Sequence, residues 1–258
     1  MESGVIVEWT LSLTPAMIDS YYSFIEVTTT AEVNHDELFK EFYDRPEIFV
    51  ILPLTSCDYA LHALYSGFEG LHELSSFIRQ LDGVKESKVH PTTMFNGNKI
   101  ELSNLDLRVV KSLYKDPRMS ISHIAEETGL TARRVRKIVD RLVESDAFIF
   151  DFTWNPNAGD SMAFIARIEY TDKKVSSEVI ENEIRKTFNL EYFYSHFSAI
   201  ESVMFSVFMI QHIFDMESIV KILRKYDGVK TVKPLIYYKA TVVNPPTIIK
   251  LEELLSKV

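Results

Sequence analysis

Hydrophobic and polar positions alternate with two periods along this chain, and both periods occur in the same order near its two ends. Period-2 stretches, typical of half-buried strands, cover residues 21–28, 48–54, 58–65, 162–170, 192–196 and 202–210. Apolar residues spaced three and four apart, typical of amphipathic helices, cover residues 35–43, 71–81, 179–188 and 216–226. With a last strand near 92–95 and near 235–240, each part reads β-α-β-β-α-β, the ferredoxin-like pattern.

A four-residue turn marks a repeat. Asp82-Gly83-Val84-Lys85 recurs at 227–230, a shift of 145 positions, and the apolar stripe of the preceding helix recurs at the same shift. We interpret this match as an internal duplication. Two helices on one face of an antiparallel sheet leave its other face free, which favours dimerisation or ligand binding there.

The segment between the two copies predicts three short helices. Asn104 is placed to cap the first helix, and Ser120 caps the second, which ends at Gly129. Thr131 then caps a third helix that runs to about residue 145. A helix, a glycine turn and another helix at this length form a helix-turn-helix. Residues 147–154 read as a strand that serves as a wing or connector.

The predicted fold class is therefore α+β, with two ferredoxin-like βαββαβ domains flanking a winged helix-turn-helix. We divide the chain into residues 1–98, which include an N-terminal connector strand, residues 99–155, and residues 156–258. The last domain ends in a short amphipathic helix, which would be marginal in water by itself. We expect that helix to pack on its own domain or on a partner chain.

The third helix predicted between the two copies is distinguished by its positive charge. The chain of 258 residues has a formal net charge of −9. Residues 101–150 hold nine basic and eight acidic residues, so the remainder carries −10. This uneven distribution of charge favours double-stranded DNA as the partner of the helix-turn-helix segment. The predicted DNA-binding residues are Ser120, Thr131, Arg133, Arg134, Arg136, Lys137 and Arg141. The alternative is a solvated basic face on a helix that only packs.

The cysteine count and the lack of targeting and membrane-spanning patterns indicate the cellular compartment. Its one cysteine, Cys57, cannot form an intrachain disulfide. The N-terminus lacks the pattern of a signal peptide, and no stretch approaches the ~18 apolar residues of a membrane span. We predict a cytoplasmic protein without a membrane partner.

Searches for short catalytic motifs find none, so we predict no enzyme activity, no cofactor and no metal site. The histidines show no metal-ligand spacing, and only His62 and His212, expected in strands, are worth attention. A lone strand histidine is more often structural than a ligand. We interpret the aromatic run at 192–197 as core or dimer interface rather than a platform for stacking bases.

The insert resembles the winged helix-turn-helix of the Lrp/AsnC transcription regulators, from Leu105-Asp106-Leu107-Arg108 through Gly129-Leu130-Thr131 to Arg141-Leu142. A strand and a βαββαβ domain ending in Asp-Gly-Val-Lys are similar to that family's RAM domain. The resemblance implies a sequence-specific regulator that reads the major groove with residues 131–145. It also implies a homodimer or higher oligomer through RAM-like sheets, paired within or between chains.

The resemblance further implies an amino-acid effector. The family tends to have a Gly-Asp-Tyr-like turn before the third RAM strand, and this chain has Cys57-Asp58-Tyr59 there. The second copy has Ser202-Val203-Met204, so the first copy is the better candidate for a ligand. The alternative is a plain hairpin turn without a ligand.

Two other functions stay open. The order of one RAM-like domain, one helix-turn-helix and a second RAM-like domain departs from the family, whose members usually have one of each. Some relatives decarboxylate tetrapyrroles, and the acidic remainder of the chain favours such an enzyme or ligand-binding protein that does not read DNA. A third possibility is a structural partner that pairs with a regulator and dilutes its DNA-reading heads.

Overall fold

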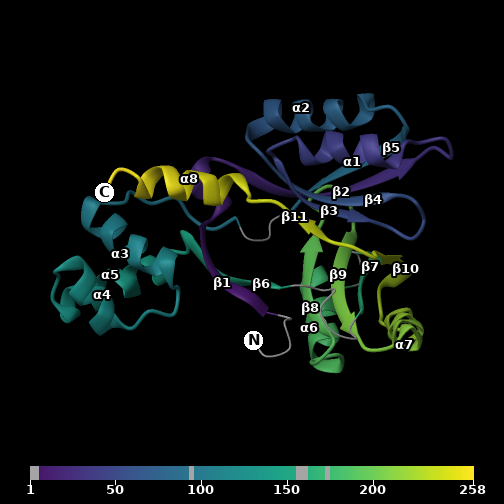
Figure 1. The fold of residues 1–258 in the computed structure, drawn as a ribbon. Coiled ribbons are helices and arrows are strands. Elements are labelled where there is room, and N and C mark those ends of the chain that lie inside the picture. Colours follow the sequence, from purple (N-terminus) through teal and green to yellow (C-terminus); the bar gives the residue numbers. More distant parts are fainter. Residues whose placement is uncertain (1–5, 93–95, 155–161, 172–174) are drawn as a thin grey trace.

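A computed structural model describes residues 6–92, 96–154, 162–171 and 175–258 (Figure 1). The first ferredoxin-like domain contains β2 (Tyr21–Thr29), α1 (His35–Tyr43), β3 (Ile48–Pro53), β4 (Tyr59–Tyr65), α2 (Gly67–Gln80) and β5 (Val84–Pro91). The second contains β7 (Met162–Tyr170), α6 (Ser177–Thr187), β8 (Tyr192–Phe197), β9 (Val203–Ile210), α7 (Ile213–Leu223) and β10 (Val229–Ile236). The antiparallel strand orders, β5-β2-β4-β3 and β10-β7-β9-β8, are the same. The predicted α+β fold class is confirmed.

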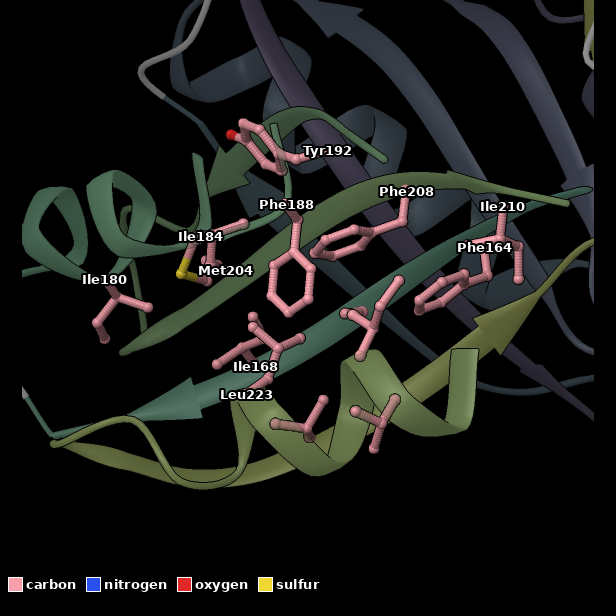
Figure 2. Packing of buried hydrophobic residues seen from close by; sticks show 14 of the residues in the cluster. Phe164, Ile168, Ile180, Ile184, Phe188, Tyr192, Met204, Phe208, Ile210 and Leu223 are labelled. Atoms are coloured by element: carbon pink, nitrogen blue, oxygen red, sulfur yellow. The ribbon is translucent and has the colours of Figure 1, made fainter. Parts of the chain in front are cut away.

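The outer face of each sheet packs on its own two helices. In the second domain Ile184 of α6 and Leu223 of α7 belong to one buried cluster with Phe164 and Phe208 of the sheet, and the Phe188 ring meets that of Phe208 at 5.7 Å (Figure 2). Burying one such aromatic side chain contributes about 1.5–3 kcal/mol. These layers hold each sheet rigid behind its inner face.

The inner faces of the two sheets pack against each other within the chain. Phe24 of β2 stacks on Phe205 of β9 with ring centroids 4.1 Å apart, inside a cluster to which both domains contribute. Backbone bridges join the sheets at Leu54 and Tyr237 and at Thr92 and Ser198. The sheet face that the helices leave free is thus covered within the chain, because its apolar residues pack on the other domain.

Three helices come between the two domains in the sequence: α3 (Asn104–Lys115), α4 (Ile121–Thr128) and α5 (Ala132–Glu144). Ser120 and Thr131 cap α4 and α5 as predicted, but Ser103, not Asn104, caps α3, in a capping box with Asp106. Gly129 ends α4 with φ +65°, the left-handed conformation that glycine adopts without a Cβ penalty. The turn between α4 and α5 therefore depends on glycine.

A two-stranded ribbon connects the three helices to the sheets (Figure 1). Strand β1 (Ile6–Leu13) pairs with β6 (Phe148–Trp154), and a 3-10 turn, η1 (Pro15–Ile18), follows β1. The C-terminal helix α8 (Pro246–Leu255) contributes Leu251 and Leu255 to the same core as α3 and β1. The predicted domain boundaries remain a prediction, but β1 and α8 both contribute to the core of the helix-turn-helix.

The last strand of each domain begins directly after its Asp-Gly turn, earlier than the sequence pattern suggested. Strand β5 ends at Pro91, and residues 93–95 of the stretch expected there lie outside the described residues. Strand β10 ends at Ile236, and the short β11 (Thr241–Val242) crosses over to pair with β3 of the first domain. Within the described residues, no helix has both the length and the apolar character needed to cross a bilayer.

Candidate functional site

A cavity of about 510 Å³ lies between the two sheets, beside the ribbon. Strands β2, β3 and β4 line one wall and β7, β8 and β9 the other, while β1, β6 and residues 240–248 line the remaining sides. We call this cavity the chamber. The polar side chains in its mostly apolar lining are Thr10, Ser12, Tyr22, His62, Asp151, Tyr194, Tyr237 and Thr247. A large apolar cavity with a few convergent polar groups is typical of a site for small organic molecules.

His62 is the central polar group of the first wall. It lies on β4 and is 5% exposed. The Tyr22 hydroxyl is hydrogen-bonded to its Nδ1, whereas its Nε2 is buried with no hydrogen-bond partner among the described residues. An unpaired buried polar atom costs about 1–3 kcal/mol, and native proteins contain few of them. His62 therefore brings one ring nitrogen without a partner to the wall of the chamber.

His196 of β8 lies next to His62. Their ring centroids are 5.0 Å apart, and the His196 ring stacks on Tyr22 at 5.1 Å and meets Tyr194 at 5.0 Å. His196 is 1% exposed, and neither of its ring nitrogens has a hydrogen-bond partner in the described part of the chain. The two domains thus bring two histidines and two tyrosines together.

Removal from water keeps this group neutral. Burial lowers the pKa of His62 to about 3, and burial with the neighbouring His62 lowers the pKa of His196 well below its usual value. Burial also raises the pKa of Tyr22 and of Tyr194. At neutral pH the site therefore offers uncharged imidazoles and protonated hydroxyls.

A second polar cluster joins the sheets outside the chamber. Arg167 of β7 donates from Nε to Glu26 of β2 at 3.0 Å and also pairs with Glu169. His90 of β5, fully buried, contacts Glu26 through Nε2 at 3.2 Å and Ser198 through Nδ1 at 2.9 Å. Burial opposes ionisation of Glu26, but the bonds to His90 and Arg167 outweigh it and lower its pKa. Every polar group here is bonded within the protein, so the cluster is structural.

The predicted effector residues lie in the β3–β4 turn and do not line the chamber. Cys57 is exposed and has φ +65°. The Asp58 carboxylate accepts the backbone N–H of Thr29 at 3.0 Å, and the Tyr59 hydroxyl is hydrogen-bonded to His35 at 2.9 Å. These contacts hold the hairpin turn, and the effector role of the three residues remains a prediction.

Helix α5 presents its cations to solvent. Arg133, Arg134, Arg136 and Lys137 are all exposed, and none has an ion-pair partner in the part of the chain that the structure describes. Val135, Ile138 and Leu142 bury the opposite stripe of the helix. Free cations on a rigid exposed helix can bind phosphate oxygens and guanine edges in a major groove.

The other three predicted DNA-binding residues have structural partners. Ser120 and Thr131 accept the backbone N–H of His123 and Arg134 as helix caps. Arg141 pairs with Asp106, whose side chain is 4% exposed, so it connects α5 to α3. The Arg141–Asp106 pair holds α5 against α3, and its loss would leave a buried carboxylate without a counter-charge.

The sequence pattern pointed to only part of the chamber. His62 was noted as a strand histidine, while His212, also expected in a strand, is the N-cap of α7. Tyr194 and the aromatic run around it were interpreted as core or interface. Tyr22 and His196 carried no signal, because the residues that meet here come from three strands of two domains. Only the pairing of the sheets brings them together.

A sequence profile of winged helix-turn-helix DNA-binding domains matches residues 102–146. No curated protein matches the sequence. Among solved structures, the siroheme decarboxylase NirDL covers 99% of this chain and 85% of its own, with a TM-score of 0.60 and 11% identity. NirDL in complex with an iron-uroporphyrin III analogue gives 0.61 and 10% over the same shares. At such identity the likeness shows the fold alone.

Lrp/AsnC-type regulators match about half of the chain. The leucine response regulatory protein of Mycobacterium tuberculosis has a TM-score of 0.43 and 19% identity, over 54% of this chain and 93% of its own. AsnC of E. coli has a TM-score of 0.41 and 16% identity, over 57% and 99%.

The full-length match corrects one prediction. The prediction that this chain is not an enzyme is wrong, because the structures that align with nearly all of it are those of an enzyme. That prediction rested on the absence of short catalytic motifs. Such motifs do not report a site whose side chains come from separate strands, as in the chamber.

Proposed function

We propose that the chamber binds a small organic molecule and exchanges protons with it through His62. The observation that carries this proposal is the chamber itself, about 510 Å³ with mostly apolar walls, in which His62 is the histidine among the described lining residues. Hydrogen bonding from a ligand would compensate the unpaired Nε2 of His62 for its loss of water. A ligand acceptor beside His62 would also raise its pKa from about 3 toward neutrality, where an imidazole transfers protons efficiently. The NirDL structures support catalysis on this architecture but leave the reaction open.

The test is a fluorescence titration with N-phenyl-1-naphthylamine, an uncharged diarylamine that becomes bright in apolar surroundings. Ala240 lines the chamber, so we expect Ala240→Trp to fill it and weaken binding by at least about tenfold, or 1.4 kcal/mol. Ala199→Trp is the matched control, because Ala199 is exposed at the β8–β9 turn. Saturation should shift the Nε2 resonance of ¹⁵N-labelled His62. Equal binding by both variants would contradict a chamber site.

We propose double-stranded DNA as a second partner, read by α5 in the major groove. The unpaired cations on α5 and the matching winged helix-turn-helix profile support this proposal. One chain carries one such helix, so a two-fold operator would require two chains. The finer assignments, to a sequence-specific regulator with a cytoplasmic location and an amino-acid effector, stay predictions.

Anisotropy titration of genomic DNA fragments at two salt concentrations tests this second function. Arg133→Ala with Arg136→Ala should lower affinity at least about tenfold and reduce the salt slope by about 2. Lys186→Ala with Lys225→Ala removes two exposed cations elsewhere and should leave both quantities unchanged. Equal losses in the two double variants would mean that α5 does not read DNA.

The two sites share structural elements. Strands β1 and β6 line the chamber and carry the helix-turn-helix, and residues 245–248 lead from the chamber into α8. A molecule in the chamber would therefore contact the elements that orient α5. We expect saturation with N-phenyl-1-naphthylamine to change DNA affinity in wild-type protein and not in Ala240→Trp.

A further inference from the structure

The described lining of the chamber contains no lysine or arginine side chain. Asp151 is the one acidic side chain among these described lining residues. His62 adds no positive charge, since burial lowers its pKa to about 3. The chain around it has a formal net charge of −9. The electrostatic environment of the chamber is thus neutral to negative.

Such walls disfavour anions. A carboxylate moved from water into apolar surroundings loses its hydration and needs a cation or several donors in return. The uncharged hydroxyls and the His62 imidazole of the chamber supply only a few donors, and Asp151 at its exposed edge repels negative charge. A compound with several carboxylates, such as a uroporphyrin, would leave these groups uncompensated.

The walls are instead suited to flat uncharged molecules. Six aromatic side chains line the chamber: Tyr22, Phe49, Phe152, Phe193, Tyr194 and Tyr237. Their faces favour stacking with other rings, and their partial negative charge tolerates a cation. Asp151 can pair with such a cation where the chamber meets solvent.

We propose that the chamber selects an uncharged aromatic compound, tolerates a cationic one and excludes polycarboxylates. This inference rests on the proposed function, that the chamber is a ligand site, and it specifies the ligand class. It also distinguishes this chain from the structure with an iron-uroporphyrin III analogue that its fold resembles.

Two probes that differ by one sulfonate test the inference. N-phenyl-1-naphthylamine and 8-anilino-1-naphthalenesulfonate share the same rings and amine. We expect the uncharged probe to bind wild-type protein at least about tenfold more tightly, and iron-uroporphyrin III not to displace it. Asp151→Lys should reduce the ratio of the two probe affinities at least about threefold, because it replaces an anion by a cation at the chamber. Glu86→Lys makes the same charge change on exposed β5 and should leave the ratio unchanged.

The outcomes separate the two proposals. If neither probe binds, or if Ala240→Trp leaves binding of the uncharged probe intact, the proposed chamber site fails. If the sulfonate or iron-uroporphyrin III binds as tightly as the uncharged probe, and Ala240→Trp abolishes this, the chamber stands and the ligand class is wrong. Asp151→Asn checks the charge effect without a longer side chain and should give a smaller change in the same direction.

Discussion

The two ferredoxin-like domains can be compared position by position. Each has a bulge at the start of its last strand, and Lys88 opposite Glu26 matches Lys233 opposite Arg167. Glu26 and Arg167 are therefore equivalent, and they also contact each other. Equivalent residues that touch lie on the local two-fold axis that relates the domains. At that axis one domain carries an anion and the other a cation.

His62 and His196 have no polar counterparts at the equivalent positions of the other domain. His62 is opposite Phe24, and the equivalent Val207 is opposite Ile165. His196 corresponds in the same way to Leu52 of the first domain. The polar set thus occurs once, while the related positions are aliphatic. Two domains of one topology therefore form unlike halves, and the contact between them includes the Glu26–Arg167 ion pair.

Reversing the charge at the axis should have the largest effect. Glu26→Arg places two guanidinium groups together in a setting where the Glu26 and Arg167 side chains are 23% and 15% exposed. We expect a loss of about 3 kcal/mol in the free energy of unfolding, the lower end for a broken buried pair. Urea titration measures it. Glu26→Arg with Arg167→Glu should recover at least half of the loss, whereas additive losses would mean that the charges do not couple.

Acid should destabilise the half of the interface that carries the histidines. The pKa of His62 is about 3 in the folded protein, against about 6.5 unfolded, so stability is full above pH 6.5 and falls as the pH drops toward 3. The loss from His62 between pH 7.5 and pH 5 is about 2 kcal/mol, and His196 contributes in the same direction. Urea titrations at both pH values should show His62→Gln losing less than wild type. A loss of equal size in the variant would place the acid sensitivity elsewhere.

Making the two halves more alike should increase stability. His196→Leu gives the second domain the residue found at the equivalent position of the first and removes two unpaired nitrogens. Replacing a buried unsatisfied group by an apolar one of similar size is expected to stabilise by about 1 kcal/mol. Urea titration at pH 7.5 measures this gain. A destabilised variant would indicate that His196 has a partner in the folded protein.

The sequence predicted most of the elements but not the site. Period and turn residues gave the order of elements in both βαββαβ domains, although the last strand of each begins earlier than predicted. Ser120, Gly129 and Thr131 predicted the helix-turn-helix, because these signals are local. The chamber depends on which faces meet, and that pairing is not local. Tyr22 and His196 are far apart in sequence, on different domains, so neither spacing nor composition brings them together. The same reason explains why β1 and α8, at opposite chain ends, were not expected to share a core.

The smallest effect we expect concerns the β3–β4 and β8–β9 hairpins. Cys57 has φ +65°, whereas the equivalent Ser202 is not among the described residues with positive φ. A side chain in the left-handed region costs about 1–2 kcal/mol, partly offset by the greater freedom of glycine in the unfolded chain. Cys57→Gly should therefore stabilise by about 0.5–1 kcal/mol, measured by urea titration under reducing conditions. Ser202→Gly should not stabilise, and a gain there equal to that at Cys57 would show that backbone strain is not what separates the two hairpins.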